Sequence, residues 1–191
     1  MKKGNWEIKK IRDVCSKASS NLAQNKLKNN FGQYPLYGAS GFVKNIDFYQ
    51  QVNEYIAIVK DGAGVGRVMV LPRFSSVLGT LQYIFPKNGI NINFLAYALV
   101  ALDLAQCASG ATIPHIYFKD YGELKILMPP LSVQKAIVKE LDTLHRIKEL
   151  QEQQLAEYDT LAQATFYDMF GDPVDNEKGW EVKRLGEVCK T

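Results

Sequence analysis

Residues 131–170 read LSVQKAIVKELDTLHRIKELQEQQLAEYDTLAQATFYDMF, a stretch that contains neither glycine nor proline. Apolar side chains recur along it every three to five positions, which is the spacing of one face of a helix. The spacing slips between 147 and 155, so the heptad pattern is imperfect. The stretch predicts one long helix, which Gly171-Asp172-Pro173 ends. The apolar positions are Ile137, Leu141, Leu144, Ile147, Leu150, Leu155, Tyr158 and Leu161.

The length of this helix predicts that it dimerises. A continuous helix of about 38 residues would be roughly 57 Å long at 1.5 Å per residue. Residues 1–130 could not cover an apolar stripe of that length, so we expect the stripe to pair with the same helix of a second chain, as in a coiled coil. The alternative is a helix that folds back in two pieces onto its own domain. The pattern leaves parallel and antiparallel pairing open.

Residues 1–130 predict a globular domain of several short strands and a few helices. Over 91–105 the apolar period changes to three and four, which predicts a helix with Asn91 or Asn93 as its N-cap. The fold class is therefore mixed α/β (α+β), with one long coiled-coil-forming helix after the domain. Strands are expected at 55–59, 68–71, 80–85 and 124–128, with short strands and tight turns over 31–49.

Charge divides the chain into two parts. Residues 1–130 contain 15 lysines and arginines and 8 aspartates and glutamates, a net charge of +7. Residues 131–191 contain 8 and 12, a net charge of −4. A basic segment joined to an acidic one indicates that the first contacts a polyanion and the second does not, although a merely soluble surface is the alternative.

The two ends of the chain repeat each other. Residues 6–15 read WEIKKIRDVC and predict a short strand and a turn of helix whose apolar side chains pack on the core. Residues 180–189 read WEVKRLGEVC, and at this constant offset of 174 only Arg12/Gly186 is a non-conservative pair. A chain that ends by restarting its own beginning is typical of a repeated unit, here a domain followed by a long helix. The apolar side chains expected to pack are Trp6, Ile8, Ile11 and Val14.

The sequence predicts no catalytic site. GAGVG at 62–66 lacks the last glycine of a dinucleotide loop, because Arg67 stands there, and the next four residues predict a strand instead of a helix. We therefore expect a hairpin tip at this turn. No GxxxxGK[ST] motif and no Ser/His/Asp or Cys/His combination is present.

Metal, membrane and disulfide chemistry are also not expected. Cys15, Cys107 and Cys189 lie far apart in the sequence and only two histidines are present, which argues against a zinc module and is typical of a reducing cytoplasm. The longest apolar run, 94–102, is much shorter than the roughly 20 residues of a membrane span. The first residues show no secretory signal, so a cytoplasmic location is expected.

Two stretches, GATIPHIY at 110–117 and LKILMPPLSVQKAIV at 124–138, resemble the specificity (S) subunits of type I restriction-modification systems. In that family, G-x-T-I-P-x-I closes a target recognition domain and P-P-L-x-x-Q-x-x-I opens a long conserved-region helix. The WEIKKIRDVC start and FGDP at 170–173 are similar to the family's unit boundaries. A full-length member carries two recognition domains and two such helices, whereas this chain has one of each.

The resemblance implies a DNA-binding target recognition domain at 1–130 and a long helix for dimerisation and spacing at 131–170. Residues 171–191 would be a linker and the start of a second unit. The chain would read one half of a bipartite target in double-stranded DNA without catalysis, and would dock modification (methyltransferase) subunits. S-adenosylmethionine and ATP are expected only on partner subunits, the restriction subunit among them. The alternative is a half-length assembly or decoy protein that binds modification subunits without productive DNA reading.

Turns with polar tips between strands are the candidate DNA contacts. Phosphates need cations or exposed amides, and base edges need side chains such as arginine or serine presented from loops. Gly110, Thr112 and Pro114 are expected to shape a turn that packs the domain on its helix, with a DNA role as the alternative. Two identical readers on antiparallel helices would predict a symmetric target. The candidate DNA-binding residues are Lys17, Lys26, Lys28, Ser40, Lys44, Lys60, Arg67, Arg73, Ser76, Thr80 and Gln82.

Overall fold

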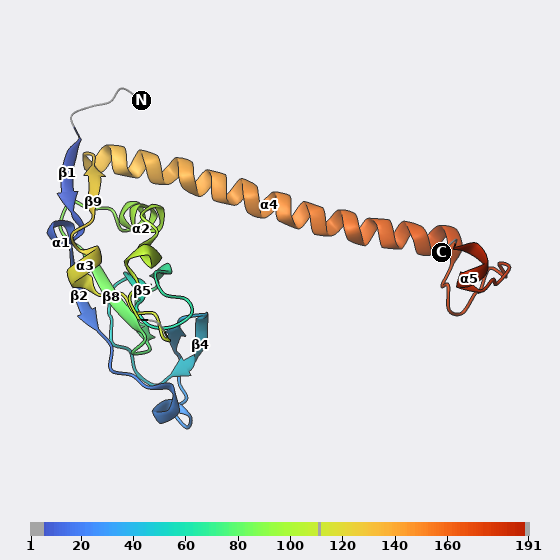
Figure 1. Cartoon of the computed structure of the whole chain (residues 1–191), viewed down its shortest axis with the longest axis horizontal. Coiled ribbons are helices and arrows are strands. Elements are labelled where there is room, and N and C mark those ends of the chain that lie inside the picture. Colours follow the sequence, from blue (N-terminus) through green and yellow to red (C-terminus); the bar gives the residue numbers. More distant parts are fainter. Residues whose placement is uncertain (1–5, 111, 190–191) are drawn as a thin grey trace. The chain divides into compact units, whose positions relative to one another are not determined.

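The computed structural model describes residues 6–110 and 112–189 (Figure 1). It divides into two units, residues 1–139 and residues 140–191. The first unit is a mixed α/β domain with several short strands, as the sequence predicts. The second unit contains most of a long helix and the segment that follows it.

The centre of the domain is a four-stranded antiparallel sheet in the order β2 (Cys15–Ser19), β8 (Leu81–Pro86), β5 (Tyr55–Val59) and β6 (Val68–Leu71). β5 is buried along its whole length, because hydrophobic layers cover both faces of the sheet at this strand. Side chains alternate between the two faces of a strand, so β5 contributes to both layers. The strands expected at 55–59, 68–71 and 80–85 are confirmed to within one residue.

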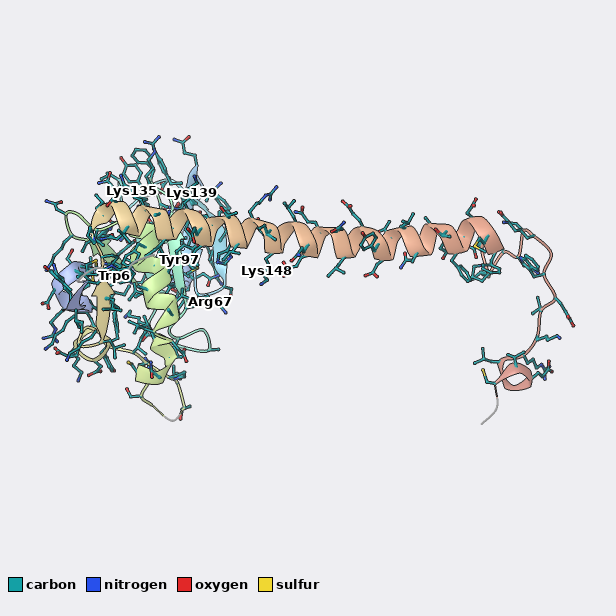
Figure 2. The ribbon with its side chains drawn as sticks, turned by 90° about the horizontal axis from the view of Figure 1, so that it is seen from above. Trp6, Arg67, Tyr97, Lys135, Lys139 and Lys148 are labelled. Atoms are coloured by element: carbon teal, nitrogen blue, oxygen red, sulfur yellow. The ribbon has the colours of Figure 1, made fainter. Side chains whose placement is uncertain are left out.

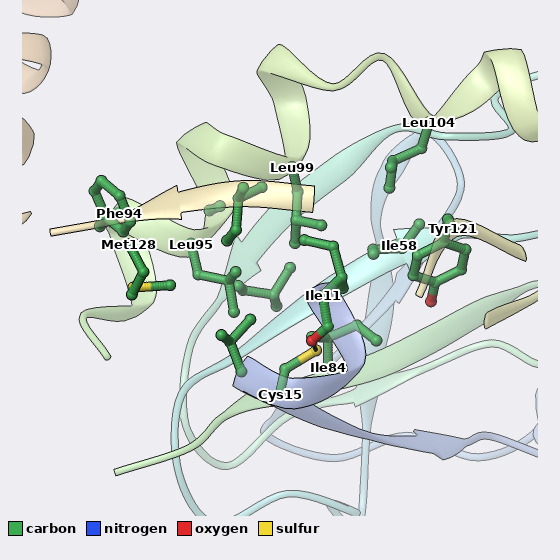
Figure 3. Packing of buried hydrophobic residues seen from close by; sticks show 14 of the residues in the cluster. Ile11, Cys15, Ile58, Ile84, Phe94, Leu95, Leu99, Leu104, Tyr121 and Met128 are labelled. Atoms are coloured by element: carbon green, nitrogen blue, oxygen red, sulfur yellow. Dashed lines mark hydrogen bonds between the residues drawn. The ribbon is translucent and has the colours of Figure 1, made fainter. Parts of the chain in front are cut away.

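The first hydrophobic layer packs the central sheet against helix α2 (Ile92–Ala101) (Figure 3). α2 begins as predicted, because the side chain of Asn91 accepts a hydrogen bond from the Phe94 amide at 3.0 Å. It ends earlier than predicted, because Asp103 adopts a positive φ of 45° and a 3-10 turn, η2 (Leu104–Cys107), follows. The buried members of the layer include Ile11, Cys15, Ile56, Ile58, Ile84, Leu95, Leu99 and Tyr121.

The second hydrophobic layer packs the other face of the central sheet against a three-stranded sheet. That sheet has the order β4 (Gly41–Ile46), β3 (Tyr34–Gly38) and β7 (Ser76–Val77). β3 and β4 form an antiparallel hairpin, and β7 joins β3 in parallel. A short 3-10 turn, η1 (Gln24–Leu27), precedes the hairpin and buries Leu27 in the layer.

A two-stranded sheet holds the N-terminal segment. β1 (Glu7–Lys10) pairs antiparallel with β9 (Lys125–Met128), and Figure 1 shows them side by side. The one-turn helices α1 (Ile11–Val14) and α3 (Phe118–Tyr121) lie next to these strands in the sequence. The strand expected at 124–128 is thereby confirmed.

The repeated segments adopt the same turn of helix in opposite environments. α1 and α5 (Leu185–Val188) are separated by the repeat offset of 174. Ile11 is fully buried, whereas Leu185, its counterpart, is 80% exposed within the described residues. Burial raises the pKa of the Cys15 thiol to about 11, so this thiol stays protonated in the core, whereas Cys189 is exposed. The expectation that Ile8 packs on the core is wrong, because its side chain is exposed.

Helix α4 (Leu131–Phe170) is one uninterrupted helix of 40 residues. The long helix is confirmed, and no break at which it could fold back occurs within it. Ile137 is an exception among the predicted dimer contacts, because it packs partly buried against the domain's own core. Beyond residue 140 the side chains stand out on all sides of the helix (Figure 2). The exposed members of the predicted stripe are Leu144, Ile147, Leu150, Leu155, Tyr158 and Leu161.

One buried amide joins the first turn of α4 to the domain. The Gln134 side chain is 1% exposed. Its Oε1 accepts a hydrogen bond from the Asn91 amide at 2.9 Å, and its Nε2 donates to the Pro129 carbonyl at 2.9 Å. The same Nε2 lies 3.4 Å from the sulfur of Met128. Gln134 therefore connects the N-terminus of α2, the end of β9 and the start of α4.

Replacing Gln134 by leucine should destabilise the domain. The Asn91 amide and the Pro129 carbonyl would lose their buried partner, which is expected to lower the free energy of unfolding by about 1–3 kcal/mol. Urea denaturation followed by circular dichroism measures the change. Gln153→Leu, at an exposed position of the same helix on the face opposite the apolar stripe, is the matched control and should change stability by less than about 0.5 kcal/mol. Equal midpoints for wild type and Gln134→Leu would contradict the proposed anchoring.

Candidate nucleic-acid interface

A surface of three loops is formed around the tip of the β5–β6 hairpin. The tip comprises residues 60–67, and the loop at 109–116 packs against it. The Gly62 amide donates to the Pro114 carbonyl at 3.0 Å, and the Ile116 amide donates to the Lys60 carbonyl at 2.9 Å. The two segments are about fifty residues apart in the sequence and become adjacent only through the fold.

Arg67 joins the third loop to this surface. Its Nη1 donates to the carbonyl of Ala39 at 2.6 Å, in the turn between β3 and β4. The arginine is exposed and is labelled in Figure 2. Ser40 follows Ala39 and is also exposed. Two of the predicted DNA contacts, Ser40 and Arg67, are thus brought together, and we name the loops 38–41, 60–67 and 109–116 the three-loop surface.

Asp61 lies at the centre of the three-loop surface. One of its carboxylate oxygens is 3.2 Å from Lys60 Nζ, and the other is 2.8 Å from Nδ1 of His115. The carboxylate compensates the charge of Lys60, so Arg67 carries the larger share of the positive potential at the hairpin tip. Thr80 is exposed, and its carbonyl accepts the Lys60 amide at 2.9 Å. Thr80 and Lys60 therefore belong to the same surface.

The glycines of the hairpin tip have conformational roles. Gly62 and Gly66 have φ angles of +93° and +86°, a region that favours glycine. The Gly66 amide donates to the Val59 carbonyl at 2.8 Å, and the Val59 amide donates to the Arg67 carbonyl at 2.9 Å, which closes the hairpin. This bonding confirms the predicted hairpin tip. A Cβ on Gly66 would lie 2.5 Å from the Ala105 nitrogen, so the tip packs tightly on η2.

The loop at 109–116 packs against the hairpin tip at 60–67, which the sequence analysis did not predict. The expectation that Gly110, Thr112 and Pro114 dock the domain on its long helix is wrong for this loop, because its backbone hydrogen bonds run to the hairpin tip. The amide and carbonyl of His115 also pair with those of Ser109, which closes the loop on itself. The loop therefore shapes the three-loop surface. Residue 111 lies outside the described residues.

A second group of predicted DNA contacts lies beside the β3–β4 hairpin. Lys44 Nζ donates to the carbonyls of Leu27 and Lys28, at 3.0 and 3.2 Å, and lies 4.0 Å from the ring centroid of Phe31. These contacts tie the segment after η1 to β4. Lys26 and Lys28 are exposed on that segment. Two solvent-facing cations therefore flank Lys44, which is fixed by its own hydrogen bonds.

Two further exposed candidates for DNA contacts, Lys17 and Arg73, belong to neither of these two groups of residues. Lys17 is on β2, with its ammonium 5.7 Å from the ring centroid of Phe118. Arg73 is in the turn between β6 and β7, with its guanidinium carbon 5.3 Å from the ring centroid of Phe74. Both of these rings lie outside the three-loop surface.

Two predicted DNA contacts are buried inside the domain. Ser76 is fully buried in β7, where its Oγ accepts a hydrogen bond from the Gln50 amide at 2.9 Å. Gln82 is buried in β8, where its Oε1 accepts a hydrogen bond from the Tyr121 hydroxyl at 2.5 Å. The prediction that they lie at exposed turns is wrong, because both belong to strands covered by a hydrophobic layer.

The sequence analysis did not identify the Asp61–His115 pair or the docking of loop 109–116. The two side chains are 54 positions apart, and no spacing rule links them. Only the pairing of β5 with its neighbours brings them together.

Among residues 6–110 and 112–189, no group of three or more His, Cys, Asp or Glu residues is arranged to hold a metal ion. Within the same residues, no helix has both the length and the apolar character that crossing a membrane requires.

Comparisons with known proteins agree with the geometry. The model of the type I restriction modification DNA specificity domain matches residues 3–158. The MjaIX specificity subunit of Methanocaldococcus jannaschii is 23% identical over 223 residues, which cover 97% of this chain and 52% of the relative. A putative type I specificity subunit of Mycoplasma pneumoniae is 28% identical over 152 residues, which cover 72% of this chain and 39% of the relative. The chain spans about half the length of the curated relatives it matches.

A solved structure shows the same fold. The crystal structure of a type I restriction-modification S subunit from M. genitalium matches with a TM-score of 0.66 at 17% identity. The match covers 94% of this chain and 50% of that chain. At this identity the likeness shows the fold, with its mixed α/β domain and long helix.

The tight packing of Gly66 generates a stability prediction. Gly66→Ala places a Cβ at a positive φ, which costs roughly 1–2 kcal/mol, and the Cβ also collides with the backbone of η2. We expect a loss of at least about 2 kcal/mol of unfolding free energy, read by urea denaturation. Gly64→Ala, in the same turn without a positive φ and with only ordinary contacts, is the matched control and should stay within about 0.5 kcal/mol of wild type. Indistinguishable alanine variants would mean that the tip does not pack on η2.

Proposed function

Because the chain belongs to the family of type I restriction modification DNA specificity domains, we propose that it recognises double-stranded DNA as a non-catalytic specificity subunit. The observation that carries the proposal is the match over residues 3–158, which includes the α/β domain and more than half of α4. The chain would supply recognition, and the chemistry on DNA would belong to other subunits.

The three-loop surface supports the DNA-reading part of the proposal. Its loops present Ser40, Lys60 and Arg67, and Thr80 lies beside them because its carbonyl accepts the Lys60 amide. Exposed polar and cationic side chains on loops are the groups that contact phosphates and base edges. The net charge of +7 over residues 1–130 would attract the DNA backbone to this domain. Lys26, Lys28 and Lys44 would add phosphate contacts beside the β3–β4 hairpin.

The exposed stripe of α4 supports homodimerisation. Leu144 is 61% exposed and Leu155 is 64% exposed within the described residues. A helix that exposes leucines at this spacing gains free energy by pairing with a second helix. Each copy would read one half of a bipartite target, and the helix pair would set the distance between the halves.

The proposed partners follow from this division of labour. Modification (methyltransferase) subunits would bind S-adenosylmethionine, and a restriction subunit, joined through the complex, would use ATP. The chain itself would hold no cofactor. Its place of action would be that of the DNA it reads, the cytoplasm.

Dimerisation through α4 is tested by placing charge in the stripe. Leu144→Glu combined with Leu155→Glu would desolvate carboxylates in a coiled-coil interface, so we expect the variant to be a monomer where the wild type is a dimer. Light scattering coupled to size exclusion measures the mass. The pair Gln153→Glu and Thr160→Glu, at exposed positions on the opposite face of the same helix, is the control and should leave the dimer intact. A monomeric wild type, or a double-leucine variant that still dimerises, would contradict the proposal.

DNA binding through the three-loop surface is tested with Lys60→Ala and Arg67→Ala. Anisotropy of a labelled duplex with a randomised centre, measured at several salt concentrations, reports affinity and the number of phosphate contacts. Each lost phosphate contact should reduce the slope of log K against log salt by about 0.9. We expect the larger effect for Arg67→Ala, since Asp61 compensates Lys60.

Lys148→Ala is the control for charge alone, because Lys148 is on α4 and paired with Glu152 at 3.5 Å. It should leave the salt slope unchanged. If Lys60→Ala and Arg67→Ala both retain the wild-type affinity and slope, these two residues do not belong to the DNA contact.

A further inference from the structure

A row of aromatic rings ends at an arginine on the surface of the domain. The rings of Tyr34 and Tyr49 have centroids 4.8 Å apart, and those of Tyr49 and Phe74 are 5.1 Å apart, both pairs edge to face. The Arg73 guanidinium carbon lies 5.3 Å from the Phe74 centroid. Tyr49 and Phe74 are each 38% exposed, so apolar ring surface faces solvent along this row.

Buried hydrogen bonds hold the end of the row. Ser75, directly after Phe74, is fully buried, and its Oγ donates to the Pro72 carbonyl at 2.5 Å and bonds the Tyr55 hydroxyl at 2.8 Å. The Ser75 carbonyl accepts the amides of Gln50 and Gln51, at 3.3 and 3.1 Å, directly after Tyr49. The segments that carry Tyr49 and Phe74 are thereby fixed to each other and to the central sheet.

The backbone of Phe74 is strained. Its φ of +55° is rare for a residue with a bulky side chain. Such a conformation persists only where the surroundings hold it, and it is concentrated at functional sites. Here the anchored Ser75 holds the conformation, and the result is an exposed ring beside an exposed guanidinium.

We propose that Arg73 and Phe74 contact bases, and so contribute to sequence choice, in the DNA-binding function proposed above, on which this inference rests. A phosphate contact needs only a cation, and an exposed aromatic ring gains nothing beside a phosphate. Base pairs in the major groove offer both kinds of partner, since guanine O6 and N7 accept from arginine and the thymine methyl packs on apolar groups. Lys26 and Lys28 lack a ring contact and would bind phosphates.

The row of aromatic rings also holds the Arg73 guanidinium in a defined orientation, which recognition of bases requires. A side chain that distinguishes bases must be held in a defined orientation, because hydrogen bonds to base edges are directional. The Phe74 ring fixes the guanidinium by a cation–π contact, and Tyr49 fixes the ring. A flexible surface lysine has no comparable support.

Selection from a randomised duplex library by the full chain tests the inference. We expect the wild type to enrich a motif and Arg73→Ala to lose its preference at one base pair, by about tenfold or more for that base. Phe74→Leu, which keeps an apolar side chain without the ring, should relax the same or the adjacent position. Lys26→Ala should weaken binding of all sequences alike, keep the motif and reduce the salt slope by about 0.9.

Phe42→Ala is the matched control, because Phe42 is a more exposed phenylalanine on β4 and lies outside the row. It should select the wild-type motif. Circular dichroism melts establish that the variants fold. If Phe74→Leu folds poorly, Phe74→Gly takes its place, because glycine adopts the positive φ without strain and still removes the ring. Selection of the unchanged motif by Arg73→Ala and by a folded Phe74 variant would overturn the inference, with DNA binding intact. A wild type that binds no DNA would overturn the proposed function and this inference together.

Discussion

The buried side-chain amide of Gln134 fixes the position at which α4 leaves the domain. Gln134 satisfies the Asn91 amide, which is the start of α2, and the Pro129 carbonyl, which is the end of β9. A buried polar group with its partners in place favours one geometry, since any shift of the helix start would leave these groups unpaired. The first turns of α4, with Val138 buried and Ile137 partly buried, thus become part of the hydrophobic core. The domain therefore fixes the start of the helix, whereas Leu144 and Leu155 farther along it are exposed.

The same physical argument explains why ten nearly repeated residues have two environments. Both copies form one turn of helix at matching positions, because that turn is a local property of the sequence. Within residues 6–110 and 112–189, the first copy pairs with β9 as strand β1, and the second copy forms no strand. Ile11 and Val14 enter the core in that copy, whereas Leu185 and Val188 are exposed. Local sequence decides the turn, and the presence of a partner strand decides burial.

Elements with a strong local period could be predicted from the sequence. β5, with five consecutive apolar residues, α2 with its Asn91 cap, and α4 without glycine or proline all have signals within a few residues. Contacts between distant segments could not be predicted in this way. The buried Gln82 has a hydrogen-bond partner because α3 provides the Tyr121 hydroxyl, and loop 109–116 docks on the hairpin because β5 brings residues 60–62 to it. Of the candidate site, the loops were predicted, but the way they combine into one surface depends on strand order.

The domain and the helical part of the chain differ in net charge and in the kind of surface that they expose. In the basic part, residues 1–130, the side chains of Arg67 and Lys44 are each held by a hydrogen bond to a backbone carbonyl of a neighbouring segment. Residues 131–191 have a net charge of −4, so a polyanion would be repelled from the helical part and attracted to the domain. A helix that exposes leucines among acidic residues instead favours a protein partner, because apolar contact outweighs weak repulsion between screened surface charges. Under the proposed function, the charge asymmetry would direct DNA to the domain and leave α4 available for association, so the two contacts would not compete for one surface.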